Sequence, residues 1–373
     1  MNELEKNLLD SDEAVVGTND EATHCKSSAV HKGYYDDTFI QSFCKSTKAK
    51  PPEINMGYYI RVYVIKCMIE YFIKLFGQEA QIISLGAGFD TTYWRLMKSQ
   101  LKFRKYVEID LPLVVYKKAH IISHNINLQQ YLTNIMDCNK ITLNKKNTNV
   151  SNNPQGNLKP SYQAHHKSSV TSQDHEIHSD NYDLLSINLR DINMVDKKFL
   201  ELNDPLNSNF IDFSKPTLFL AECVLVYMEN SEADSLLKWI VSRFKSTICF
   251  LNYEQVNMGD NFGLIMQDNL KNRGCCLLGV DQCLNESSQR NRFLNVGWDS
   301  VQVDSILKLF YSMPDLEKHR ILNLEFLDEK ELLYQLLDHY CLCWACKNVC
   351  YENVESKDIN KKMQTTISQG TSF

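Results

Sequence analysis

The chain has 373 residues, a formal net charge of −6, and 43% hydrophobic residues. This composition supports a sizeable core, in two domains or in one large α/β domain with an insertion. The acidic balance argues against a nucleic-acid-binding protein, which normally carries a basic surface. No run approaches the ~18 apolar residues of a membrane span, and the acidic N-terminus has no apolar signal core. We therefore expect a soluble protein of the cytoplasm.

Residues 1–14 are strongly charged, and we expect them to be disordered. Residues 15–350 are expected to form a single domain, beginning with short helices before residue 52, and residues 351–373 a flexible tail. Apolar side chains recur at spacings of three and four over residues 53–76, which predicts one long helix. Arg61 falls on that apolar stripe. It either extends its charge to the edge of the core or serves a ligand.

The stretch QIISLGAGFDTT, residues 81–92, is a short apolar run that stops at Gly86 and is followed by Gly88. Such glycines let the backbone turn tightly and approach a nucleotide-sized ligand without a Cβ in the way. Thr91 occupies the position of the third glycine in the dinucleotide fingerprint. This substitution disfavours a pyrophosphate cofactor and favours a smaller adenosine ligand such as S-adenosylmethionine (SAM).

A second strand is predicted over residues 105–109, and Asp110 closes it. An acid about 20 residues beyond the glycine turn is where an α/β nucleotide fold places its ribose-binding carboxylate. The alternative is an aspartate on a surface loop. Glu108 either shares the ribose role or faces the other side of the sheet.

Residues 138–180 are rich in Asn, Ser and Lys and nearly lack aliphatic side chains, so we predict a disordered insertion. Its HEIH run does not match the HExxH zinc pattern. The cluster CLCWACKNVC, residues 341–350, contains one CxxC but no second pair, and its alternation is that of a buried strand. We therefore expect no metal site.

Further strands are predicted over residues 182–187, 216–221 and 247–252. Repeated strand and helix patterns indicate an open parallel sheet, which binds ligands outside the carboxyl ends of its strands. Several polar or glycine positions fall at those ends: Gly86, Asp110, Asn188, Glu222 and Asn252. Glu222 interrupts an apolar run, where a carboxylate is costly to bury without a partner. A ligand-facing role is favoured over a structural ion pair.

Several blocks together resemble the eukaryotic leucine carboxyl methyltransferase family. They are PPEINMGYYIRV (51–62), LGAGFDTTYWRL (85–96), AECVLVYM (221–228), NYEQVNMGDNFG (252–263) and LEFLDEKELLYQLLDHYCLCWA (324–345). The resemblance covers residues 16–345 except the insertion. It implies a class I SAM-dependent methyltransferase fold, Rossmann-like, with helices on both faces of a mostly parallel sheet and extra N-terminal helices. It also implies methylation of the C-terminal leucine carboxylate of the protein phosphatase 2A catalytic subunit.

Carried over by position, the resemblance implies that Lys26 and Arg61 lie near the methionine carboxylate of SAM or the carboxylate of the substrate. It places Gly86 in the turn under SAM, Asp110 at the ribose, and Glu222 at the amino group of the methionine moiety. Asn188 and Leu189 would border the adenine. The family usually has Asp-Leu there, so Asn188 is a departure that removes charge assistance, about 1 kcal/mol of binding free energy.

A peptide α-carboxyl has a pKa of ~3.3–3.7 and is already anionic at neutral pH, so its methylation needs no general base. Arg61 suits a bidentate carboxylate clamp, and Lys26 a mobile point charge. Tyr227 either donates a hydrogen bond to the same carboxylate or is a core aromatic.

Three rival functions differ in class. A dehydrogenase is disfavoured by Thr91. A catalytically weak or inactive SAM-fold protein that binds the phosphatase tail stays open, because Asn188 and the insertion indicate relaxed constraint. A tRNA-modifying relative would carry an additional repeat domain, for which this chain has no repeat. We expect a monomer.

Overall fold

The computed structural model describes residues 3–44, 48–135, 175–204, 210–349 and 359–370, with side chains described from Ala14 onward and, in the last range, from Gln364. Its centre is an eight-stranded sheet with the order β3-β4-β2-β1-β5-β6-β8-β7. The strands are β1 (Gln81–Leu85), β2 (Lys105–Asp110), β3 (Ile177–His178), β4 (Tyr182–Ser186), β5 (Thr217–Glu222), β6 (Ile248–Gln255), β7 (Ser300–Ser305) and β8 (Tyr340–Lys347).

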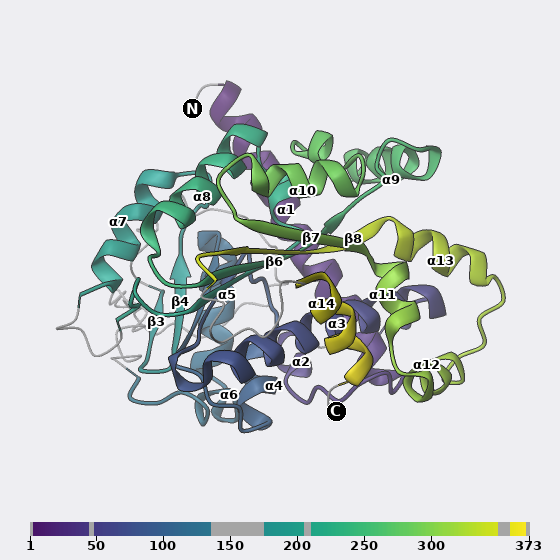
Figure 1. The fold of residues 1–373 in the computed structure, drawn as a ribbon, viewed down its shortest axis with the longest axis horizontal. Coiled ribbons are helices and arrows are strands. Elements are labelled where there is room, and N and C mark those ends of the chain that lie inside the picture. The colour runs from purple at the N-terminus through teal and green to yellow at the C-terminus, as the bar shows by residue number, and fades with distance from the viewer. Residues whose placement is uncertain (1–2, 45–47, 136–174, 205–209, 350–358, 371–373) are drawn as a thin grey trace, which may run out of the picture.

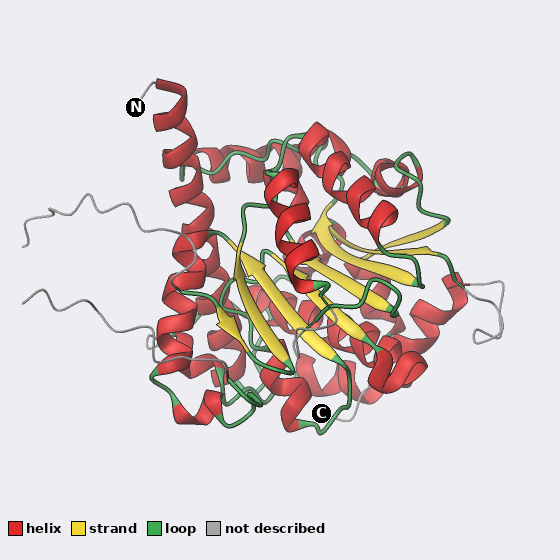
Figure 2. Cartoon of the chain, turned by 90° about the vertical axis from the view of Figure 1, so that its left-hand side faces the viewer, coloured by secondary structure: helices red, strands yellow, loops and turns green. Residues whose placement is uncertain are grey.

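Helices lie on both faces of this sheet (Figures 1 and 2). In chain order they are α1 (Glu3–His31), α2 (Ile40–Phe43), α3 (Pro52–Phe76), α4 (Thr92–Lys98), α5 (Pro112–Ser123), α6 (Ile126–Gln129), α7 (Ile192–Leu202), α8 (Asn230–Arg243), α9 (Asn261–Lys271), α10 (Glu286–Leu294), α11 (Ile306–Ser312), α12 (Asp315–Leu322), α13 (Lys330–Asp338) and α14 (Ile359–Gln369). Short 3-10 helices are η1 (Gly77–Glu79), η3 (Leu225–Tyr227) and η4 (Val280–Cys283).

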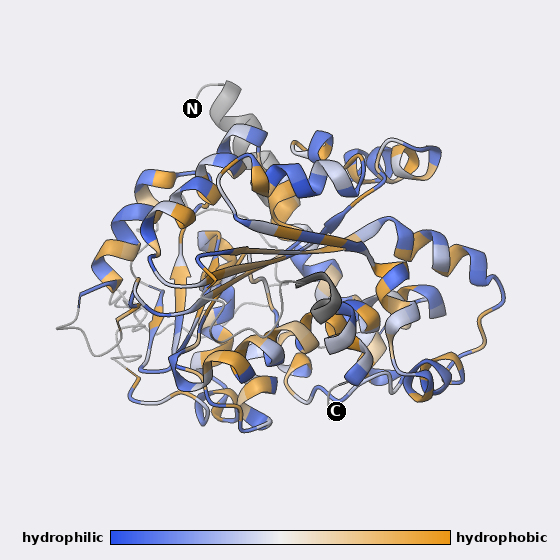
Figure 3. Cartoon of the chain, viewed as in Figure 1, coloured by the Kyte–Doolittle hydropathy of each residue, from blue (hydrophilic) through white to orange (hydrophobic). Residues whose placement is uncertain are grey.

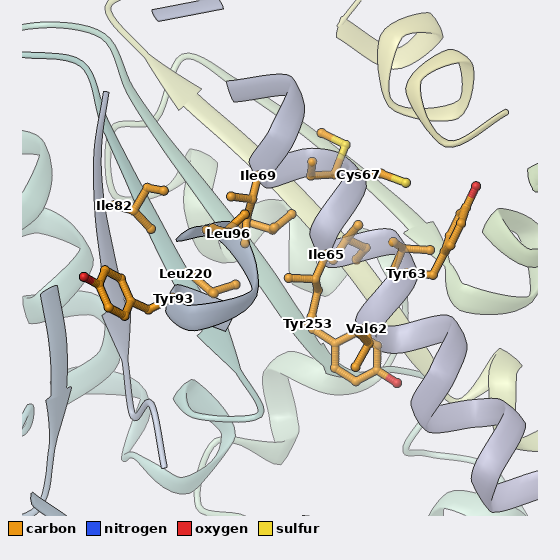
Figure 4. Close-up of a cluster of buried hydrophobic side chains, with 14 of the residues drawn as sticks. Val62, Tyr63, Ile65, Cys67, Ile69, Ile82, Tyr93, Leu96, Leu220 and Tyr253 are labelled. Carbon is orange, nitrogen blue, oxygen red and sulfur yellow. The ribbon is translucent and has the colours of Figure 1, made fainter. Parts of the chain in front are cut away.

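The strands are apolar on both faces, because alternate side chains point to opposite helix layers. On β1, Ile82 joins a core cluster with α3, α4, α5 and α11, whereas Ile83 joins a second cluster with α7, α8 and α10. Figure 4 shows part of the first cluster, including Ile65 of α3 and Leu220 of β5. The hydrophobic colouring of the strands in Figure 3 follows from this two-sided burial.

The predicted parallel sheet is confirmed for β4, β2, β1, β5 and β6, which pair in parallel. The remaining strands, β3, β7 and β8, pair antiparallel at the two sides. The predicted buried strand at residues 340–345 is β8. Its Cys341 and Cys343 point to the same face, where both are buried in the second core cluster.

Three predictions of disordered or loose segments were wrong for the described residues. Helix α1 begins at Glu3, so the expected disorder of residues 1–14 does not hold for the described backbone, and α1 replaces the short helices expected there. Helix propagation is cooperative, and Glu, Leu and Lys favour it, so a helix anchored by packing further on extends through a charged segment. Strand β3 lies inside the predicted insertion of residues 138–180, most of which falls outside the described residues. The predicted loose tail contains α14.

A prediction near β6 also differs from the structure. Asn252 does not end its strand, because β6 continues to Gln255 and leaves Asn252 fully buried in mid-strand. The apolar run of residues 301–309 is divided between β7 and α11. Its first half alternates between buried faces beside β8, and Ser305 then caps the helix. None of the described helices has the length and apolar character that a membrane span requires.

Candidate active site

A cavity of about 870 Å³ lies at the carboxyl ends of β1, β2, β4 and β5, with α1 and α9 supplying much of its remaining lining. Every residue predicted for the site lies in its lining: Lys26, Arg61, Gly86, Asp110, Asn188, Leu189, Glu222 and Tyr227. These residues come from α1, α3 and four strand ends, so the tertiary fold brings them to one place. Asn252 is not among the lining residues.

The turn after β1 has two residues in the left-handed region, Gly86 at φ +58° and Gly88 at φ +53°. A Cβ at Gly86 would lie 2.7 Å from Cγ2 of Val224, and one at Gly88 would lie 2.5 Å from Oδ1 of Asn19. Neither distance is tolerable for carbon, so both conformation and space require glycine here. The turn therefore presents bare backbone to the cavity.

Asp110 is tied to this turn. Its Oδ2 accepts a hydrogen bond from the Gly88 amide at 2.6 Å, and its Oδ1 accepts one from the Leu111 amide at 2.7 Å. Burial raises the pKa of Asp110 above its usual value, and the two amides oppose that shift. Each oxygen keeps a second lone pair, so the carboxylate can still accept from a ligand hydroxyl.

Four charged side chains form a compact cluster in the cavity. Lys26 Nζ lies 2.6 Å from Asp90 Oδ2 and 3.3 Å from Glu222 Oε2. Arg61 Nε lies 2.7 Å from the same Glu222 oxygen. Burial alone would raise the pKa of Asp90, but Lys26 and Arg95 lower it below the usual aspartate range. The cluster thus pairs two basic side chains with two acidic ones.

The second oxygen of Glu222, Oε1, and one terminal nitrogen of Arg61, Nη1, have no hydrogen bond within the described residues. Both groups belong to cavity-lining side chains. The cavity therefore offers a ligand a carboxylate oxygen of Glu222 and a guanidinium nitrogen of Arg61. This arrangement suits a ligand that carries both an amino group and a carboxylate.

Aromatic rings fix the plane of the Arg61 guanidinium. Its central carbon lies 4.7 Å from the ring centroid of Tyr253 and 5.6 Å from that of Tyr58. Tyr340 stacks on Tyr253 with centroids 5.3 Å apart and lines the cavity. Burial raises the pKa of Tyr227 well above its usual value, which keeps that hydroxyl protonated as a donor.

The adenine end predicted from Asn188 and Leu189 lies after β4. Oδ1 of Asn188 accepts hydrogen bonds from the backbone amide of Arg190 at 3.1 Å and from its Nε at 3.0 Å. Both lone pairs of this oxygen are therefore used inside the protein. An adenine amino group would have to displace one of the two donors.

Three of the lining residues that the sequence analysis did not name have notable contacts or backbone conformation. Asp90 binds Lys26, and it directly follows the glycine turn in GAGFD, which is the signal that could have drawn attention to it. No feature of the sequence marks Asn19, but its Oδ1 accepts a hydrogen bond from the Phe89 amide at 2.7 Å. Cys223 has φ +56°, an unusual value for a residue other than glycine, next to Glu222.

Comparison with known proteins adds to this geometry. The family model described as "Leucine carboxyl methyltransferase" matches residues 14–241. Leucine carboxyl methyltransferase 1 of Bos taurus is 39% identical over 90% of this chain and 90% of its own length. The chain belongs to the leucine carboxyl methyltransferase family. The relative of the same name from Caenorhabditis elegans is 37% identical over 91% of this chain and 93% of its own.

Among solved structures, human N-acetylserotonin methyltransferase in complex with SAM aligns with 90% of this chain and 67% of its own at 12% identity. The TM-score of 0.36 is too low for that likeness to carry an argument. The family membership rests on sequence, and it makes this protein a leucine carboxyl methyltransferase. SAM is the cofactor that the resemblance of the sequence implies.

The residues present fit that cofactor. The Gly86 turn leaves no room for a Cβ, so it can only offer backbone to a ligand that approaches closely. Asp110 is placed for ribose hydroxyls, and Leu189 offers an apolar edge for a base. Glu222 Oε1 could accept from the amino group of a methionine moiety, and Arg61 Nη1 could donate to its carboxylate or to the carboxylate of an acceptor.

Proposed function

We propose that this enzyme methyl-esterifies the C-terminal leucine carboxylate of the protein phosphatase 2A catalytic subunit, as a monomer in the cytoplasm. The observation that carries the proposal is the pair of buried cations, Lys26 and Arg61, beside the cofactor turn in a protein of this family. An anionic acceptor is the substrate class that such a site favours. The phosphatase is proposed as the substrate because the sequence resembles the leucine carboxyl methyltransferase family.

Charge balance supports a carboxylate acceptor. The cluster of Lys26, Arg61, Asp90 and Glu222 is neutral as a whole. SAM, when bound, supplies a methyl group on a cationic sulfur. An anionic carboxylate is attracted to this positive charge, whereas a neutral alcohol is not.

The residues of the chain act by binding and orienting. The Arg61 guanidinium, held in one plane by Tyr58 and Tyr253, can direct a carboxylate oxygen towards the methyl group. Lys26 keeps an ammonium hydrogen beyond its bonds to Asp90 and Glu222. Bound SAM would supply the methyl group to the carboxylate oxygen, and since that acceptor is already anionic no residue of the chain has to move a proton.

The test incubates the purified enzyme with phosphatase core enzyme and methyl-tritiated SAM. The proposal predicts label on the catalytic subunit that base hydrolyses, as expected of an ester. A phosphatase variant that lacks only the terminal leucine should take up no label. Label that persists on that variant would refute the proposed substrate.

The second candidate is a catalytically weak or inactive protein that binds the phosphatase tail, which the departure at Asn188 favours. It predicts retention of the phosphatase on the immobilised protein without labelling at any SAM concentration. Labelling that appears once SAM is raised several-fold would instead mean a weakened cofactor site in an active enzyme.

A further inference from the structure

Lys118 of α5 lies outside the cavity lining, yet it is bonded to the cofactor turn. Its Nζ donates to the carbonyl oxygen of Gly88 at 2.9 Å and to that of Asp90 at 2.9 Å. It also lies 2.5 Å from Oε2 of Glu108. An ammonium has three N–H donors, so all three of its hydrogens are used. Two of the three hold the backbone of the same turn.

The surroundings of this ammonium are costly for a charge. Lys118 and Glu108 are both completely buried. The nitrogen lies 5.5 Å from the ring centroid of Trp94 and 5.7 Å from that of Phe43. Replacing a buried ion pair by apolar side chains is often neutral or stabilising, so stability alone does not explain this pair.

Hydrogen bonds to Asp110 and to Lys118 therefore fix the backbone of the turn on both sides. The Gly88 amide donates to Asp110, while the Gly88 carbonyl accepts from Lys118. The Asp90 carbonyl accepts from Lys118 as well, and the Asp90 side chain binds Lys26. Through the backbone of the turn, Lys118 therefore connects the carboxylate of Asp110 with the charged cluster that contains Lys26 and Asp90.

The partner of Lys118 is itself fixed. Oε2 of Glu108 also accepts from the hydroxyl of Tyr182 at 2.6 Å. Glu108 and Tyr182 lie on adjacent strands β2 and β4, and Tyr182 pairs with Tyr106, two residues before Glu108, so the two side chains are diagonal neighbours on one face. Glu108 is not among the cavity-lining residues, although alternation puts it on the same face of β2 as Asp110, and its carboxylate binds Lys118.

We propose that Lys118, supported by Glu108 and Tyr182, is a positioning residue that preorganises the turn of residues 86–90 for SAM. The inference rests on the cofactor and not on the identity of the methyl acceptor. A turn already fixed in its binding conformation loses less entropy when the ligand arrives, so the free enzyme binds more tightly.

The chain offers a matched control in Lys105, the first residue of β2. Its Nζ lies 2.9 Å from Asp183 and donates to the Ser179 carbonyl at 2.8 Å, and both ionic partners are buried. Alternation places this pair on the opposite face of the sheet from Glu108. Lys105→Met thus removes an equally buried ion pair that does not touch the cofactor turn.

The experiment measures SAM affinity by calorimetry for wild type, Lys118→Met and Lys105→Met, with thermal unfolding of each. We expect Lys118→Met to weaken SAM binding about tenfold and to leave the KM for the protein substrate unchanged. Lys105→Met should change SAM affinity less than about twofold, whatever its effect on melting. Equal losses of affinity in both variants, or none in Lys118→Met, would overturn the proposal.

A second measurement needs neither cofactor nor activity. Hydrogen exchange of the apo enzyme should show faster exchange of the amides of residues 86–92 in Lys118→Met than in Lys105→Met. Should Lys118→Met fail to fold, Glu108→Gln keeps the shape but gives the ammonium a neutral partner. That variant should show the same faster exchange and about threefold weaker SAM binding. Wild-type exchange and affinity in Glu108→Gln would then contradict the proposal.

Discussion

At the scale of single residues, we expect methyl transfer to depend most on Arg61. Arg61→Ala should lower the transfer rate by at least about 100-fold, because it removes the group that orients the carboxylate. Glu222 keeps Lys26 as a partner, so the fold should be retained. Transfer is measured with labelled SAM, and circular dichroism checks the fold.

A matched control is Arg243→Ala, which removes a half-exposed arginine that binds Asp196 on the other side of the sheet. That variant should transfer methyl groups at the wild-type rate. Near wild-type turnover in Arg61→Ala would remove Arg61 from the mechanism.

Asn188 is the second residue from which we expect an effect on cofactor affinity. Its single acceptor oxygen is used twice by Arg190. In Asn188→Asp, one carboxylate oxygen can keep Arg190 while the other accepts from the adenine amino group with charge assistance. We expect SAM to bind about fivefold more tightly, measured by calorimetry. Asn127→Asp, at an exposed position, controls for the added charge, and unchanged affinity in Asn188→Asp would refute this account of the adenine end.

At the scale of secondary-structure elements, α14 stabilises the helix layer around α3. Ile367 of α14 is completely buried, and its carbonyl accepts from the Tyr63 hydroxyl at 3.2 Å. Ile367→Ala should lower the free energy of unfolding by about 2–4 kcal/mol, because it leaves a cavity in this contact. Urea denaturation measures the loss. The same substitution at Ile126, which is exposed, should change it by less than about 0.5 kcal/mol, and equal effects at both positions would mean that α14 does not contribute to the core.

At the scale of the whole molecule, stability should depend on pH through the β3 edge of the sheet. Burial opposes the charge of His178, but contacts with Asp183 and Glu176 raise its pKa from 6.5 to about 9. A folded-state pKa above the unfolded one gives stability that is fully present below pH 6.5 and is lost as the pH rises through 9. The side chain is 35% exposed, so solvent screening reduces the contribution to about 1 kcal/mol.

His178→Gln tests this. At pH 6 the variant should be less stable than wild type by about 1 kcal/mol, and at pH 9.5 or above the two should converge. Urea unfolding at both pH values gives the difference. A difference that does not change with pH would show that His178 contributes packing and not charge.

By itself the sequence determined the alternation of strands and helices, the glycine turn and the residues at the strand ends. These features are local: burial on both faces makes a strand apolar throughout, and a left-handed turn demands glycine at Gly86 and Gly88. The family blocks pointed to the same cavity residues that the fold assembles. Predictions failed where order depends on distant partners, as for β3 and α14.

Only the tertiary structure decided which charges meet. Asp90 and Lys26 are 64 residues apart, and Lys26 and Glu222 are 196 apart, so no sequence spacing could pair them. The orientation of Glu108 likewise depended on α5 packing over the sheet, which brings Lys118 beneath the turn. The sequence determines the chemistry of each side chain, but long-range packing decides which partner stabilises a buried charge.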